Sequence, residues 1–134
     1  MINIPKVLIK LQNILEISEE CRKHVLNKEF TKIKKDYNNM EASGKDAVDE
    51  LTKIEEEISE ENKRSRILKI KEQVDRVLKQ DIAAVKRKHD ILIIDPHREF
   101  TKQGLIEDLD RIQRASTLLI SELARISQSR ILAA

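Results

Sequence analysis

Apolar residues recur along the chain at intervals of three and four, and short polar stretches interrupt them. This spacing places the apolar side chains on one face of an α-helix. The first stripe predicts a helix over about residues 5–38, roughly 50 Å long at about 1.5 Å per residue. Pro5 suits the first turn of this helix, where its missing N–H costs little. The polar stretch at residues 38–45, which contains Asn38 and Gly44, predicts that the helix ends there.

A second helix is predicted to follow, with Ser43 as its N-terminal cap and a stripe that ends at Ile58. The next eight residues, SEENKRSR at 59–66, contain no apolar side chain. They form either a loop between two helices or the exposed middle of one continuous helix. Two glutamates lie at helical spacing from Arg64, but such pairs stabilise a helix by only about 0.2–0.5 kcal/mol each. The sequence leaves both alternatives open.

The stripe resumes at Ile67 and predicts a helix that ends within residues 91–94, because Pro96 disfavours helical backbone in the residue before it. The last helix is predicted to begin at Pro96 or, after a kink, near Thr101. Its stripe comprises Leu105, Leu109, Ile112, Ala115, Leu119, Leu123 and Ile126, flanked by Ile106, Leu118 and Ile120. This is the widest apolar face in the chain, so we expect this helix at the centre of a bundle.

Composition supports an all-helical fold. The 134 residues are about one domain's worth, and two Gly, two Pro and 2% aromatic residues disfavour a sheet protein. Charged residues at 37% and apolar residues at 40% suit long amphipathic helices. The sequence therefore predicts a single all-α domain over residues 1–134, an elongated antiparallel bundle of three to four long helices.

The balance of charge excludes some classes of partner. There are 26 basic and 24 acidic residues, for a net charge of +2, and this lacks the basic excess of a nucleic-acid binder. We therefore expect no nucleic-acid partner. A single cysteine fits a reducing compartment. The sequence contains no run of about 18 apolar residues, so it predicts no membrane span.

Nothing in the sequence supports enzyme activity. His24, His89 and His97 lie on different predicted elements, without cysteine or carboxylate at metal-ligand spacing. Cys21 lies one helical turn from His24, but a cysteine on an apolar stripe usually packs as a small hydrophobic residue. The chain has no glycine-rich phosphate loop and no GxSxG or zinc motif. We predict no catalytic, metal or cofactor-binding residue and no cofactor.

Two charged stretches are candidate docking patches. The acidic cluster at residues 55–61 is more often simply a solvated helix face. The stretch KRKH at residues 86–89 could contact a membrane or a phosphate, but a position near a helix end suits basic side chains in any case. Neither stretch by itself identifies a partner.

The beginning of the chain is a candidate protein-binding surface. Its apolar stripe is wider than one neighbouring helix needs, because Ile9 and Ile17 lie outside the main stripe. The alternative is that the whole stripe belongs to the internal core. The residues predicted to bind a partner are Ile4, Val7, Leu8, Leu11 and Leu15.

Residues 105–130, LIEDLDRIQRASTLLISELARISQSR, resemble the helix before the SNARE motif in the Sec-twenty (BNIP-one type) family of endoplasmic-reticulum Q-SNAREs. The shared features are Ser116 and Thr117 near the middle of a leucine-rich helix, then the ISEL pattern at residues 120–123. Residues 49–80 are similar in style to the middle helices of that family, with a charged break between two amphipathic stretches.

The resemblance implies the cytosolic N-terminal domain of a SNARE on the endoplasmic reticulum membrane, acting in Golgi-to-ER retrograde transport and membrane fusion. The implied partner is a Tip-type subunit of the ER (Dsl-type) tethering complex. The SNARE motif and tail anchor of the family are absent from the chain and would follow this domain. In the family, these two segments bind the SNARE partners and attach the protein to the membrane. Two other classes remain: a subunit of another elongated coiled-coil assembly, such as a kinetochore or tether component, and a helical bundle that binds a membrane surface.

Overall fold

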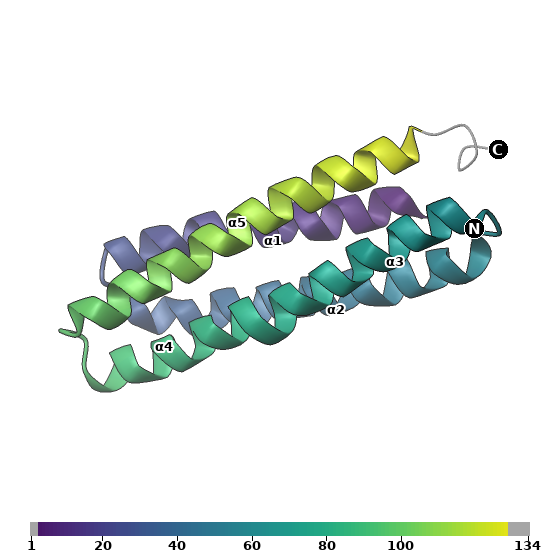
Figure 1. Ribbon diagram of the computed structural model, residues 1–134. Helices are drawn as coiled ribbons and strands as arrows, with labels where there is room; N and C mark the ends of the chain where they lie inside the picture. Colours follow the sequence, from purple (N-terminus) through teal and green to yellow (C-terminus); the bar gives the residue numbers. More distant parts are fainter. Residues whose placement is uncertain (1–2, 129–134) are drawn as a thin grey trace.

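The computed structural model describes residues 3–128. Four long helical segments run up and down in an elongated antiparallel bundle (Figure 1), and no strand occurs in these residues. The segments are α1 (Ile4–Leu26), α2 (Ile33–Glu57), a rod formed by α3 (Glu61–Arg76), η2 (Val77–Ile82) and α4 (Ala83–Ile94), and α5 (Glu99–Ser127). Helix α1 packs against α2 and α5, and the rod closes the other side of the bundle. The predicted all-α fold is confirmed.

The first predicted helix is wrong at its C-terminal end. Helix α1 stops at Leu26, and the short 3₁₀ helix η1 (Phe30–Lys32) connects it to α2. Lys28 has a φ of 59°, its N–H donates to Val25 O, and the Glu29 N–H donates to His24 O. These paired bonds form a Schellman motif, which usually has glycine or asparagine at the left-handed position. Because this position is a lysine, the sequence did not indicate that the helix ends here.

The turn predicted at residues 38–45 is also wrong, because these residues lie inside α2. Ser43 is a buried residue of that helix and not a cap. Gly44 faces Leu78 of η2, and a Cβ at Gly44 would lie 2.5 Å from Leu78 Cδ2. The glycine therefore permits close approach of two helical segments. In the sequence, a glycine in this role cannot be distinguished from a glycine in a turn.

The polar stretch at residues 59–66 contains the end of a short loop and the beginning of a helix. The chain turns at residues 58–60, and the rest of the stretch forms the first turns of α3. The Glu60 side chain accepts from the Asn62 and Lys63 N–H groups, so a glutamate caps this helix. The loop alternative is correct, but the loop is only three residues long.

The other predicted boundaries lie close to the observed ones. Helix α4 ends at Ile94, within the predicted range, and a π-helical turn, η2, continues the rod without a break. Helix α5 begins at Glu99, between the two predicted starts, after a turn in which the Asp95 side chain accepts from the His97 N–H.

The core is aliphatic and runs the length of the bundle. Helix α5 contacts α1 and every segment of the rod but not α2, and α2 likewise contacts α1 and every segment of the rod. The prediction that α5 lies at the centre is therefore wrong, because α5 is one of the four sides of the bundle and its wide apolar face packs against two neighbours. Its fully buried side chains include Leu105, Leu109, Ile112 and Leu123. No helix within residues 3–128 has the length and apolar character needed to cross a membrane.

Candidate functional site

The five predicted partner-binding residues of α1 do not share one surface. Ile4, Val7 and Leu11 are buried in the core, between neighbouring helices. Packing explains part of the width of this stripe, because α1 contacts both α2 and α5 and each neighbour needs its own set of apolar side chains. Ile17 is partly buried against the core, whereas Ile9 is 60% exposed. Leu8 is half-buried against the core, and Leu15 is half-buried. Of the five residues, only these two remain available for contact from outside.

Leu15 lines a groove between α1 and α5. Glu19 lies beside it on α1, and the other wall is formed by Gln113, Arg114, Thr117 and Leu118 of α5. Leu118 is 67% exposed. It also lines two hollows between α5 and the rod, one with Ala115, Leu119 and residues of α3 and η2, the other with Ile70 and Glu122. We call Leu15, Ala115 and Leu118, together with Ile70, which is only 4% exposed, the α5 groove surface.

Sequence reasoning treated Leu118 as a flanking member of the core stripe. The signal that could have separated it is the helical angle, because a residue next to Leu119 points about 100° away from it. Leu119 is 3% exposed and Leu118 is outside the core. Leu118 is thus a large apolar side chain with no internal partner to bury it.

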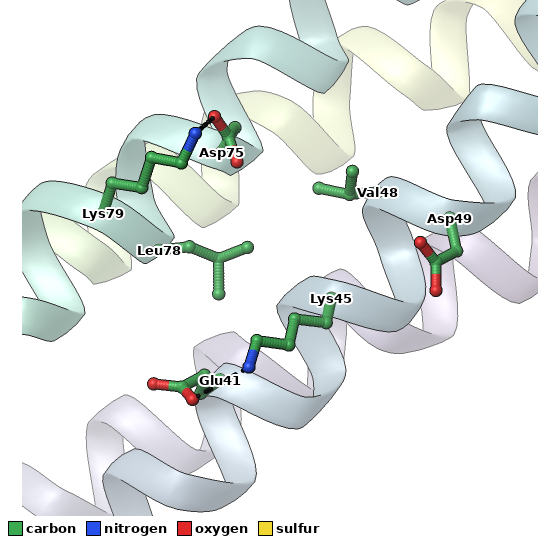
Figure 2. A pocket seen from close by; sticks show the side chains of 7 residues that line it. All are labelled: Glu41, Lys45, Val48, Asp49, Asp75, Leu78 and Lys79. Atoms are coloured by element: carbon green, nitrogen blue, oxygen red, sulfur yellow. Dashed lines mark hydrogen bonds and ion pairs between the residues drawn. The ribbon is translucent and has the colours of Figure 1, made fainter.

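A separate hollow, between α2 and the rod, has an apolar floor and charged walls. Figure 2 shows Val48 and Leu78 between two ion pairs, Lys45 with Glu41 and Lys79 with Asp75. Lys86 and Lys45 donate to Glu41 and lower the pKa of its carboxyl group. The hollow measures about 310 Å³, at the lower limit of ligand pockets. Its acidic and basic groups are largely paired with one another, so it offers no poised acid, base or nucleophile.

Cys21 and His24 lie together with Asp36, which sequence reasoning did not connect to them. His24 Nδ1 is 2.6 Å from Asp36 Oδ2. Burial raises the pKa of the Cys21 thiol, and the negative charge of Asp36 raises it further. A nucleophilic cysteine needs the opposite environment, a nearby cation that stabilises the thiolate. This arrangement suits a buried structural thiol.

The other two histidines have separate surroundings. The His89 ring packs edge-to-face on Tyr37, with 5.4 Å between ring centroids, and His97 is exposed in the α4–α5 connection. Within residues 3–128, no group of three or more His, Cys, Asp or Glu side chains is arranged to hold a metal ion.

The chain matches no protein-family model, no curated protein and no solved structure. The resemblance of residues 105–130 to the Sec-twenty family therefore stays a prediction. What the geometry offers for function is exposed apolar surface, and the α5 groove surface combines such surface with hollows on both sides of Leu118.

Proposed function

We propose that this bundle is a non-catalytic protein-binding domain whose α5 groove surface receives a helix of a partner protein. The observation that carries the proposal is the exposure of Leu118 on α5, between a groove toward α1 and hollows toward the rod. A helix laid along such a groove buries apolar anchors at three- and four-residue spacing. Burying one leucine contributes roughly 1.5–3 kcal/mol.

The charges around this surface favour a partner helix with acidic flanks. Arg114 lines the groove toward α1, and Lys69 lines the hollow toward α3. Neither has an ion-pair partner within the described part of the chain, whereas Arg66 and Glu122 face each other across the hollow at 3.9 Å. Acidic residues beside the anchors of a partner helix would pair with Arg114 and Lys69 and fix its orientation.

The finer proposal comes from the resemblance. It makes this chain the N-terminal domain of an ER Q-SNARE, and it makes the partner a Tip-type subunit of the tethering complex in Golgi-to-ER retrograde transport. Leu118 belongs to residues 105–130, which carry the resemblance, and Leu15 belongs to the predicted partner-binding set. These two positions connect the proposed groove to the resemblance and to the predicted partner-binding set.

The test is the variant Leu118→Glu, assayed for binding to the Tip-type tether subunit by calorimetry. We expect the affinity to fall about tenfold or more, because a charge would replace a central apolar anchor. The matched control is Ile9→Glu, which places the same charge on another exposed apolar residue, 60% exposed on α1. It should bind as the unmodified chain does.

Both variants should retain the melting temperature, since both positions are exposed. Unchanged affinity of Leu118→Glu for the tether subunit would exclude the groove as the contact. Absence of any binding by the unmodified chain would refute the finer proposal.

A further inference from the structure

Exposed apolar side chains gather at one end of the bundle. Eight large apolar residues of the described chain are exposed, and five of them belong to this end: Leu26, Ile91, Ile93, Ile94 and Phe100. Ile94 is 87% exposed and Phe100 is 94% exposed, in a chain that has only two phenylalanines. Scattered single exposures are normal, but a cluster at one place indicates an interaction surface.

Two connections meet at this end. The α1–α2 connection and the α4–α5 connection both lie at the left of Figure 1, and α4 contacts η1 directly. The ring contact between Tyr37 and His89 joins the start of α2 to the end of α4. We call this end, residues 20–37 and 86–102, the basic tip.

The basic tip concentrates the positive charge of the molecule. Its residues include eleven Lys and Arg and six Asp and Glu, a net charge of +5, whereas the whole chain carries +2. The remainder is therefore net acidic. Five cations of the tip have no ion-pair partner among residues 3–128: Lys28, Lys34, Lys35, Arg87 and Lys102.

We propose that the basic tip docks on the surface of a bilayer that contains anionic phospholipids. A membrane surface attracts cations near it, with an energy of about 1 kcal/mol for each Lys or Arg. Ile94 and Phe100 would enter the boundary between headgroups and acyl chains, as apolar side chains of peripheral proteins do.

The shape of the tip favours a bilayer over a protein partner. Ile93, Ile94 and Phe100 are exposed and flank the turn between α4 and α5 at the end of the bundle. A projecting apolar group with cations around it matches a soft anionic surface, whereas helix recognition needs a concave surface. This inference is independent of the proposed groove, because no residue of the groove or its hollows belongs to the basic tip.

The test uses the whole chain in co-sedimentation with vesicles of phosphatidylcholine containing about 30% phosphatidylserine. We expect binding to these vesicles, little binding to phosphatidylcholine alone, and loss of binding as salt rises from about 0.1 M to about 0.5 M. The double variant Ile94→Ser with Phe100→Ser should weaken binding about tenfold or more, since it removes the apolar insertion. Lys28→Glu with Lys102→Glu should weaken it as well.

The matched control is Ile9→Ser with Leu118→Ser, which makes equivalent changes at two exposed apolar residues elsewhere. It should bind vesicles within about twofold of the unmodified chain, while the tip variant should still bind the tether subunit. The proposal is overturned if the unmodified chain does not bind anionic vesicles or if the tip variant binds them as well as the unmodified chain does. It is also overturned if the control variant loses as much vesicle binding as the tip variant. Loss of tether binding by the tip variant, with no vesicle binding by the unmodified chain, would instead make the tip a protein contact.

Discussion

The inner face of α5 and the basic tip are built from the same kinds of side chain but differ in exposure. Leu105, Leu109 and Ile112 of α5 are fully buried, whereas Ile94 and Phe100 are almost fully exposed. Helix α5 has α1 on one side and the rod on the other, while Ile94 and Phe100 lie at the α4–α5 connection, where the bundle ends (Figure 1). The difference shows that the number of surrounding helices, and not local apolar content, decides which apolar residues form the core.

The largest expected effect comes from placing the same carboxylate in each region. Leu123→Asp should lower the free energy of unfolding by about 3–5 kcal/mol, because it removes a buried side chain and buries an unpaired charge. Ile94→Asp should change it by less than about 0.5 kcal/mol, since water reaches that position. Circular dichroism during thermal unfolding measures both. Equal losses of unfolding free energy in the two variants would mean that the tip is part of the core. An unchanged unfolding free energy in Leu123→Asp would mean that the end of α5 is not part of the core.

Much of the fold could be predicted from the sequence because apolar periodicity reports directly on helices. The extent of α5 and the end of α4 followed from the dense stripe and from Pro96. The central place predicted for α5 did not follow, because a wide stripe does not distinguish a central helix from a helix with two neighbours. The α1–α2 break could not be found, because its left-handed residue is Lys28 instead of glycine. Conversely Gly44, which suggested a turn, serves the contact with Leu78.

The candidate site was harder to predict than the fold. A stripe shows that a helix is buried on one face, but it does not show how many neighbours share that face. For this reason Val7 and Leu11 were assigned to a partner, although α2 and α5 bury them. Leu118 and Phe100 were not selected, because only the three-dimensional arrangement shows that no helix covers them.

The comparison of buried and exposed positions extends to charged residues. Asp108 is 1% exposed and accepts from Lys88 Nζ, 2.7 Å away, and from Arg111. Asp108→Asn should destabilise the bundle by about 1–3 kcal/mol, because it weakens two charge-assisted hydrogen bonds in the interior. Asp110→Asn is the control, since Asp110 pairs with Arg22 in a half-exposed position and should cost less than about 1 kcal/mol. Chemical denaturation of both variants measures the difference, and similar costs would show that burial does not strengthen the Asp108 contacts.

The smallest expected effect is a gain of stability at Asp81, which lies at the margin between interior and surface. Burial raises the pKa of its carboxyl group, and the negative charge of Asp108 contributes, even though Arg111 opposes the shift from 3.8 Å away. The folded protein therefore holds this proton more tightly than the unfolded chain does. As the pH rises above 3.8, the ordinary pKa of the carboxyl group, the ionisation of Asp81 lowers the free energy of unfolding. Asp81→Asn removes this titration, so it should stabilise the bundle at pH 7 by less than about 1 kcal/mol, and its advantage over the unmodified chain should shrink as the pH is lowered toward about 4. Melting temperatures of the two proteins measured in parallel from neutral to acidic pH test this, and a variant that is less stable at pH 7 would mean that the ion pair with Arg111 outweighs the cost of burying the charge.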